Sequence, residues 1–407
     1  MVYLIILILL LFGIYRYDYR NARSGRLIYW IALCFIFACV AGLRYKLGQD
    51  TITYINEYNT LRPITRINAE DFERTRFAPG FVVITSVFKQ FTGEFTFFQF
   101  FHSVIVNGVI FYFFYKHCRH IFFAALVYFF YLYFLLCFQQ MREAFAVCIF
   151  LLAWPAFRDG RWLWWYVASL FAFMFHISAL IMFFLPLISI PGLRQLFIFG
   201  GRTWFVCLGI AVLGAAVQAI FFRYIELIAF SASMLERIET YKNNSLGGSL
   251  LNFNGIIGTF FQYILYPLLA LYFLQQRKKD NGRDYMRFDK FNAFVLMSVY
   301  VTIFSISVTI IARFNNYFFP FAILALSDWI FGYLKMKRDR IRLRLVYWVI
   351  IFLPMFCFHI SGTYFNNMNR SGTLKTYMVY YPYTSVFDKN MDKKTERAIN
   401  YIRRRII

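Results

Sequence analysis

The sequence predicts an all-α polytopic membrane protein with about twelve transmembrane helices. Hydrophobic residues make up 60% of the 407 residues and aromatic residues 23%, which is more apolar surface than a soluble chain of this length buries. Apolar runs long enough to cross a bilayer recur along the whole chain. These runs are continuous rather than alternating, which favours helices over the strands of a membrane barrel.

The apolar runs define a series of expected crossings. In chain order they are residues 2–15, 27–43, 95–115, 121–138, 141–157, 162–175, 177–190, 203–222, 254–275, 291–312, 314–333 and 345–361. A further apolar stretch, "FAPGFVVITSVFKQF" at 77–91, covers only about half a span plus a turn. We therefore expect a re-entrant or interfacial helix there.

Basic residues indicate the orientation of these crossings. Loops 16–26, 277–290 and 335–344 are dense in Lys and Arg, so they are expected in the cytoplasm, with the N-terminus outside. All three loops share that side only if the long apolar stretch 162–190 crosses twice. We therefore expect two short helices that meet near His176.

This topology predicts one transmembrane helical domain over residues 1–361. Its outer loops are 44–94 and 223–253, and the tail 362–407 is expected outside as well, in the periplasm. The chain is therefore expected to be a multi-pass membrane protein whose outer side is the exterior, or the periplasm if the cell is Gram-negative.

The net charge of +23 at first suggests nucleic acid or anionic lipid as a partner. We assign much of the charge to cytoplasmic loops and part of it to an anionic, phosphate-bearing substrate, so membrane lipids are expected as partners and nucleic acid is not. The seven cysteines are odd in number and include no CxxC, which indicates neither a disulfide framework nor a metal site. Glycine-loop, zinc-protease and serine-hydrolase signatures are missing from the sequence.

The unusual polar residues all fall on the outer side in this topology. They are Arg44, Asp50, Gln139, Gln140, Arg142, Glu143, His176 and Arg313, together with the tail segment "YYPYTSVF" at 380–387. Ionisable groups at membrane depth usually face a bundle interior or a watery cavity. The outer ends of the helices are therefore the predicted place of the functional site.

Arg142 is the arginine least well explained by a structural role. Gln139, Arg142 and Glu143 share one helical face by their spacing. Snorkelling at an interface is the plainer account of Arg44 and Lys46. That account is weaker for Arg142, because a helix that must re-enter lipid follows it.

A second arginine ends a polar stripe. Ser298, Thr302, Ser305, Thr309 and Arg313 step by four, three, four and four residues, which predicts one face of a single helix. Ordinary small-residue packing accounts for the hydroxyl positions. It does not account for the charge at the end of the stripe.

Proton acceptors accompany these arginines. His176 in "FMFHISAL" is one, although a lone histidine is more often packed than catalytic, and His359 in "FHISGT" is a weaker second candidate. Asp50 and Glu57 are seven residues apart and share a face if that stretch is helical. Paired carboxylates suit glycosidic chemistry, but this spacing alone is a weak signal.

Six segments occur in an order and spacing that resembles the EpsG/Wzy family of polysaccharide polymerases, and the resemblance covers nearly the whole chain. They are "LRYKLGQDTITYINEY", "PGF", "QQMREAFAV", "FHISAL", "ARFNNYF" and "YPYTSVF". One departure is Ala78, which stands where the family pattern leads us to expect an acidic residue. No role is carried over to that position.

The resemblance implies a membrane glycosyltransferase of the GT-C type that needs neither a metal ion nor another cofactor. Such enzymes move a growing glycan from its undecaprenyl pyrophosphate carrier onto the non-reducing sugar of the next lipid-linked repeat. The reaction takes place at the outer face of the inner membrane, and the products are O antigen, capsule or exopolysaccharide. The same analogy suggests a chain-length regulator of the Wzz type as a partner.

Roles follow from this implied chemistry. Arg142 and Arg313 are expected to bind the pyrophosphate, because guanidinium forks hold phosphate oxygens and stabilise a charged leaving group. Arg44 is expected to position a second phosphate. Asp50 either orients Arg44 or acts as the base, and His176 is the other candidate base.

Further substrate-binding positions are expected near these residues. They are Gln139, Gln140 and Glu143, and the tyrosines Tyr54, Tyr381 and Tyr383. The tyrosines are expected to stack on sugar rings, although an interfacial aromatic belt is the plainer explanation.

Three other functions remain open on this reading. A ligase that uses the same lipid-linked donor needs the same arginines, but such enzymes usually carry one large outer loop. A transporter or flippase for a lipid-linked sugar predicts charges at mid-depth and an internal repeat, and neither is clear in this sequence. A purely structural protein gives no reason for the charges to share one face.

Overall fold

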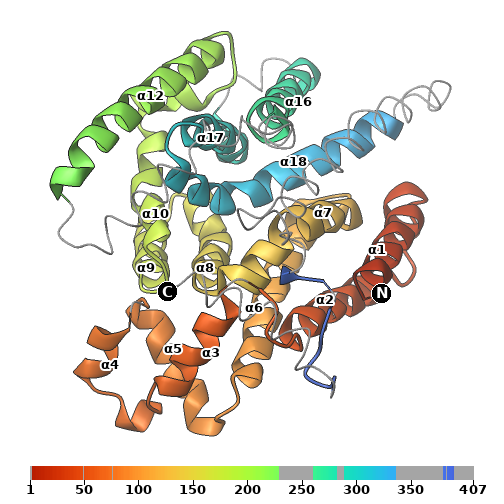
Figure 1. Cartoon of the computed structure of the whole chain (residues 1–407). Helices are drawn as coiled ribbons and strands as arrows, with labels where there is room; N and C mark the ends of the chain where they lie inside the picture. The colour runs from red at the N-terminus through yellow and green to blue at the C-terminus, as the bar shows by residue number, and fades with distance from the viewer. Residues whose placement is uncertain are drawn as a thin grey trace, which may run out of the picture. The chain divides into compact units, whose positions relative to one another are not determined.

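The computed structural model describes residues 2–48, 50–75, 77–228, 260–281, 288–335, 379–381 and 383–388. These residues are helical apart from connecting turns and one isolated antiparallel bridge between Arg44 and Ser385 (Figure 1). The chain forms two compact units. Unit 1 contains Met1–Leu185 and Asn367–Ile407, and unit 2 contains Pro186–Asn366.

Unit 1 carries most of the predicted outer residues. Its α-helices are α1 (Val2–Gly13), α2 (Arg26–Gly42), α3 (Thr51–Thr60), α4 (Ala69–Arg74), α5 (Pro79–Phe91), α6 (Phe95–His117), α7 (Ile121–Tyr128), α8 (Met141–Arg158), α9 (Trp162–Phe173) and α10 (Leu180–Phe184). Its π-helical segments are η1 (Ile14–Tyr19), η3 (Phe129–Tyr133) and η4 (Leu135–Gln139), and its 3₁₀ turns are η2 (Ile64–Arg66) and η5 (Ile177–Ala179).

The core of unit 1 is aromatic. Along the α2–α6 contact, Trp30 and Phe37 pack on Phe111 with ring centroids 4.4 and 5.2 Å apart. Edge and tilted ring contacts of this kind add to the free energy of area burial. Gly42 brings the end of α2 against α6, because a Cβ there would lie 2.8 Å from the Cα of Phe100. The close approach at Gly42 places the residues after α2 directly beside α6.

Helices α3, α4 and α5 lie beside one another, in the red to orange part of Figure 1. Asn68 caps α4 through a capping box with Asp71, which satisfies two helix N-terminal donors. Pro79 occupies the first turn of α5, where its missing N–H costs nothing. The predicted short helix at 77–91 is therefore confirmed as a helix, and its placement in a membrane stays a prediction.

Unit 2 contains the later helices. In chain order they are η6 (Leu185–Ser189), which begins at the last residue of unit 1, α11 (Pro191–Arg194), η7 (Gln195–Phe197), α12 (Arg202–Ile228), η8 (Phe260–Leu265), α16 (Tyr266–Asn281), α17 (Lys290–Ser305), η10 (Thr309–Phe314) and α18 (Asn315–Lys335). Within the unit, α17 packs against α12, α16 and α18. A hydrogen bond of 2.6 Å between Tyr266 and the hydroxyl of Ser298 joins α16 to α17.

Each predicted crossing from 2–15 to 314–333 falls on helical structure, wherever the chain is described. Among the described residues, three helices are long and apolar enough to span a membrane: Val2–Tyr19, Phe95–His117 and Arg202–Ile220. A fourth is added if the bent pair Ile177–Ser189 and Pro191–Phe197 counts as one span. The expected crossing at 345–361 lies outside the described residues, so the total of about twelve and the GT-C fold stay predictions.

One predicted element is wrong in its extent. The stripe from Ser298 to Arg313 does not lie on one helix, because α17 ends at Ser305 and residues 309–314 form the separate 3₁₀ turn η10. The sequence that follows Ser305, "ISVTII", is rich in β-branched residues, which favour helix continuation poorly. The stripe's hydroxyls bond within their own helix, as Thr302 does to the carbonyl of Ser298 over 2.7 Å.

Candidate functional site

The first turn of α8 is the centre of the candidate site in unit 1. The π-helical segment η4 ends at Gln139, and Gln140 takes the N-cap position of α8. The carbonyl oxygen of Met141 lies 3.0 Å from Nε2 of the fully buried His102 on α6. This contact fixes the position of the first residue of α8. It therefore also fixes the backbone from which the next two side chains, Arg142 and Glu143, extend.

Arg142 stands over an aromatic floor. Its guanidinium carbon lies 4.5 Å from the ring centroid of Phe77, which is a cation–π contact. The Tyr54 ring packs against Phe77 and Phe81, with centroids 5.4 and 5.6 Å apart. The side chain of Arg142 is half-buried, so it can meet a ligand without leaving this floor.

Arg142 also acts on Tyr54 electrostatically. Burial raises the pKa of Tyr54, while the positive charge and hydrogen bond of Arg142 oppose that rise and the negative charge of Asp50 adds to it. Tyr54 is 3% exposed, so it is held as a neutral phenol beneath the arginine. The structure thus brings together Asp50, Tyr54 and Arg142 as one electrostatic group.

His176 and Glu143 form the second part of the site. Both side chains are buried, and Nδ1 of His176 lies 3.9 Å from Oε2 of Glu143. The same Nδ1 lies 2.6 Å from Oγ of Ser178 and accepts from the Ser178 main-chain N–H over 3.2 Å. The carboxylate sits at position three of α8, near the positive end of the helix dipole, where a negative charge is favoured.

Gly80 joins these two parts. Its main-chain N–H donates to the carbonyl oxygen of Met174, two residues before His176. The "PGF" segment therefore has a packing role: it holds α5, and with it Phe77, against the turn that carries the histidine.

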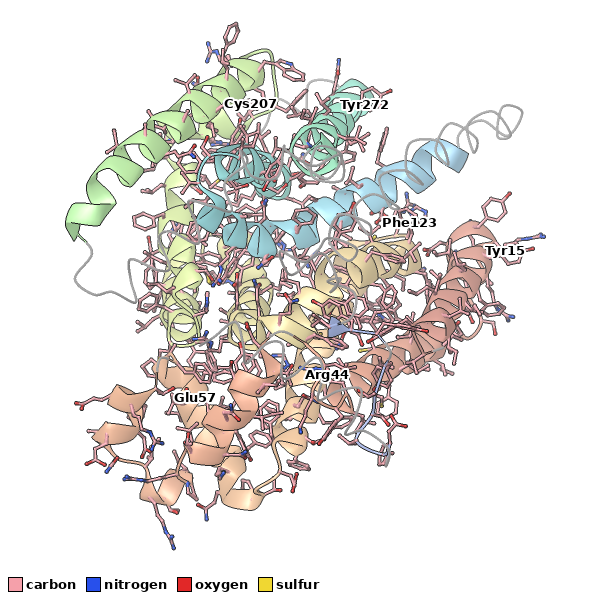
Figure 2. The ribbon with its side chains drawn as sticks, in the orientation of Figure 1. Tyr15, Arg44, Glu57, Phe123, Cys207 and Tyr272 are labelled. Atoms are coloured by element: carbon pink, nitrogen blue, oxygen red, sulfur yellow. The ribbon has the colours of Figure 1, made fainter. Side chains whose placement is uncertain are left out.

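Arg44 occupies a different environment from Arg142. It is 1% exposed, and its guanidinium donates to the carbonyl oxygens of Ala41 and Leu47, the latter over 3.1 Å. The guanidinium carbon lies 4.6 Å from the ring centroid of Phe138. Burial lowers the pKa of Arg44 to about 10, so the group keeps its charge at neutral pH. Figure 2 labels Arg44 within unit 1.

The two carboxylates after α2, Asp50 and Glu57, lie in different environments. Asp50 is exposed at the N-cap position of α3. Glu57, on the same helix (Figure 2), accepts a hydrogen bond of 3.1 Å from Thr75. Within the part of the chain that the structure describes, neither forms an ion pair with Arg44, whose hydrogen-bond acceptors are the two carbonyls and the sulfur of Met141. The expectation that Asp50 orients Arg44 stays a prediction.

The tail segment, which belongs to unit 1, packs beside Arg44. Gln139 donates to the hydroxyl of Tyr380, and the Tyr383 hydroxyl donates to the carbonyl of Val40 over 3.0 Å. Tyr383 is thus held in packing, whereas the Tyr381 ring is exposed. Of the tail tyrosines proposed to stack on sugars, Tyr381 alone has an exposed ring in the described part of the tail.

Comparison with protein families shows which family this chain belongs to. The model of the EpsG family matches residues 27–385, from the second residue of α2 to the residue paired with Arg44. The chain belongs to the EpsG family. No curated protein and no solved structure matches it.

EpsG family membership confirms the resemblance drawn from the six segments. Five of them, all but "ARFNNYF", lie in unit 1, where they form the Arg142 and His176 clusters and the contacts around Arg44. Arg313, in the remaining segment, lies exposed on η10 of unit 2. His359 lies outside the described residues.

Several residues of this EpsG family site were not singled out from the sequence. They are Phe77, Gln99, His102, Met141 and Ser178. Gln99 donates to the carbonyls of Gly42 and Arg44 over 2.7 and 2.8 Å. A polar pair such as Gln99 and His102 inside an apolar helix was the available signal. No cluster of metal-ligating side chains occurs within the described ranges.

Proposed function

We propose that the protein is a polysaccharide polymerase of the inner membrane. It transfers the growing glycan from undecaprenyl pyrophosphate onto the non-reducing end of the next lipid-linked repeat, at the periplasmic face. Family membership supports a polymerase-type function in general. The observation that carries the specific proposal is Arg142, held over Phe77 beside Tyr54, one residue from the Glu143–His176 pair.

In this proposal Arg142 binds the pyrophosphate of the lipid-linked glycan donor. As the glycosidic bond breaks, its electron pair stays on the pyrophosphate, and negative charge grows on that leaving group. A guanidinium fixed by a ring and a phenol stabilises this charge without reorganising during the reaction. The half-buried setting increases the value of each contact relative to bulk water.

His176 takes the part of general base. The acceptor hydroxyl forms the new bond to the anomeric carbon and gives up its proton, which the base receives. In the structure Nδ1 accepts from the Ser178 main-chain N–H. To act as base, His176 gives up that contact and carries its proton on Nδ1, directed at Oγ of Ser178, which leaves the lone pair on Nε2 for the acceptor's proton. Glu143 favours that tautomer and stabilises the imidazolium that forms. Asp50, which is exposed, is the alternative base.

The remaining expectations belong to the same proposal. The substrates are undecaprenyl-pyrophosphate-linked oligosaccharides, and the proposed GT-C-type chemistry uses no metal ion or cofactor, because arginine supplies the positive charge. Arg313, Gln139, Gln140 and Tyr381 are proposed as further substrate contacts. Membrane lipids and a Wzz-type chain-length regulator are the proposed partners.

The test uses purified protein in detergent with undecaprenyl-pyrophosphate-linked repeats from the host strain. The products of wild type, Arg142→Ala and Arg158→Ala are compared on a gel, with and without EDTA. Arg158 is the matched control, because it lies at the other end of α8 and pairs with Asp159 on the surface. We expect ladders from wild type and Arg158→Ala in both conditions, and loss of about 100-fold in rate for Arg142→Ala.

Other outcomes distinguish the competing functions. A wild type that forms no ladder but transfers glycan to an added lipid or protein acceptor is a ligase. A wild type that moves intact lipid-linked repeats across liposomes without joining them is a transporter. Activity that EDTA abolishes would contradict the metal-free mechanism.

A further inference from the structure

Arg44 is a cation buried among main-chain carbonyls rather than carboxylates. It donates to Ala41 and Leu47, and its NH2 group lies 3.8 Å from the sulfur of Met141. The carbonyl of Ala41 belongs to the last turn of α2, at the negative end of that helix dipole. Together with the Phe138 ring, these groups replace the water that the guanidinium loses on burial.

The same guanidinium joins two segments that are far apart in sequence. One is residues 43–51, which lead from α2 into α3, and the other is residues 138–141, which lead into α8. Thr51 adds a second link, because its hydroxyl lies 2.6 Å from the carbonyl oxygen of Leu47 and 3.3 Å from that of Phe138. Arg44 and Thr51 therefore hold the connection between α2 and α3 against the start of α8.

Gly48 shows how close this approach is. Its φ is +110°, and a Cβ there would lie 2.3 Å from the carbonyl oxygen of Phe138. A side chain at this position is excluded both by the backbone conformation and by the contact. The two segments consequently have one fixed spacing.

The tail covers the other edge of residues 43–48. The main-chain N–H of Tyr45 donates to Thr384 over 2.9 Å, that of Val386 donates to Leu43 over 3.0 Å, and that of Gly48 donates to Val379 over 3.2 Å. These bonds satisfy main-chain groups of a stretch of turns and bends, in which Arg44 forms an isolated bridge with Ser385. Residues 379–381 and 383–388 thus form a strap, which binds the main chain of the same segment that the Arg44 side chain holds.

Both segments connect directly to the candidate site. The first contains Asp50 and is followed by Tyr54 on α3, and the second is followed by Arg142 and Glu143 on α8. We propose that Arg44 is a positioning residue: its buried fork sets the spacing between these segments and so holds Tyr54 beneath Arg142, with the strap closing the arrangement. This assignment replaces its expected role as a second phosphate ligand, and its kinetic part rests on the proposed function.

The test compares Arg44→Gln, Arg44→Lys and Thr51→Val with wild type. Thr51→Val removes the second link and leaves the charge of Arg44 intact, so it remains informative if the arginine variants do not fold. Arg62→Gln is the control, because Arg62 is an exposed arginine after α3 whose nearer partner, Glu70, is exposed as well, and such a pair contributes little. Its more distant partner, the buried Asp71, keeps its pair with Arg74 in this variant. Hydrogen exchange, the Kd for undecaprenyl pyrophosphate and kcat per folded molecule are measured for each.

We expect faster exchange in peptides 43–51, 138–143 and 383–388 for Arg44→Gln and Thr51→Val. The Kd for undecaprenyl pyrophosphate is expected to stay at the wild-type value, while kcat falls by about 100-fold for Arg44→Gln, the cost of misplacing catalytic groups by about an ångström. A double variant that combines Arg44→Gln with Thr51→Val is expected to be no worse than Arg44→Gln alone, since both changes act on one spacing. Arg44→Lys keeps a charge but not the fork, so only partial recovery is expected.

Two results would overturn the proposal. If Arg44→Gln weakens lipid pyrophosphate binding while exchange stays at the wild-type level, Arg44 is a ligand. If exchange accelerates while kcat per folded molecule is unchanged, Arg44 serves stability alone. A wild type without polymerase activity would defeat the proposed function instead, and the exchange of peptide 138–143 together with the Kd would still decide whether Arg44 positions or binds.

Discussion

The main-chain N–H of Gly80 lies 2.7 Å from the carbonyl oxygen of Met174. This single bond connects the helix that follows Phe77 to the turn that precedes His176. A Cβ at position 80 would lie 2.8 Å from that oxygen and 3.1 Å from its carbon. The spacing between the arginine floor and the histidine therefore depends on the missing side chain of Gly80.

Substitution of Gly80 by Ala tests this dependence. We expect Gly80→Ala to lower the free energy of unfolding by about 1–3 kcal/mol, because overpacking forces the backbones apart, and to reduce kcat in the folded protein. Gly93→Ala is the control, since a Cβ at Gly93 meets nothing within 4 Å. Thermal unfolding and the ladder assay measure both effects. Equal behaviour of the two variants would show that the Gly80 contact is unimportant.

The aromatic floor under Arg142 gives a second prediction. Phe77→Leu keeps an apolar side chain but removes the ring face, so we expect donor affinity or rate to fall by about 3- to 30-fold, the range of a partly desolvated cation–π contact. Phe91→Leu is the matched change at the last residue of α5, where the ring is exposed, and it should leave activity unaltered. Steady-state kinetics with the lipid-linked donor measures both. If Phe77→Leu has the kinetic constants of wild type, the Phe77 ring does not contribute to the site.

The Glu143–His176 pair predicts non-additive kinetics. We expect His176→Gln to reduce kcat by about 100-fold or more, and Glu143→Gln by a smaller factor, since the carboxylate acts only through the imidazole. The double variant should resemble His176→Gln alone. Asp50→Asn is measured in parallel, and a larger loss there than in His176→Gln would transfer the role of base to Asp50.

Alkaline pH is expected to loosen the tail segment. Burial raises the pKa of Tyr383 to about 12, against an opposing effect of the Arg44 charge. The folded state thus prefers the neutral phenol, and its contribution to stability is complete below the ordinary value of 10.0 and is lost as the pH rises through about 12. The melting temperature of wild type should fall more steeply over this window than that of Tyr383→Phe. Parallel curves would show that the phenol does not couple to folding.

Helix positions were predictable from apolar runs because burial in lipid or in a core leaves a long continuous signal. The run at 203–222 became α12 and that at 95–115 became α6. The end of α17 was not predictable from spacing, because the same steps of three and four fit a continuing helix and a 3₁₀ turn. The β-branched residues after Ser305 carried the only local warning.

The candidate site was partly predictable. Arg142, Glu143 and His176 stood out as charges at the ends of apolar runs, and the structure places them together. Arg44 stood out for the same reason, yet it is buried among carbonyls. Sequence records that a charge is near a helix end, but not whether its partners are water, a ligand or the backbone, since main-chain acceptors carry no sequence signature.

The strap has a consequence for how the protein is made. Leu43, Tyr45 and Gly48 obtain main-chain partners from residues 379–386, and the side chain of Thr384 reaches Tyr45 across 339 positions of chain. A ribosome needs some tens of seconds, on the order of 20–70 s, to cover that distance at about 5–20 residues per second. During this time the main-chain groups of Leu43, Tyr45 and Gly48 lack these partners. The order of synthesis therefore makes the surroundings of Arg44 one of the last parts of unit 1 to be completed.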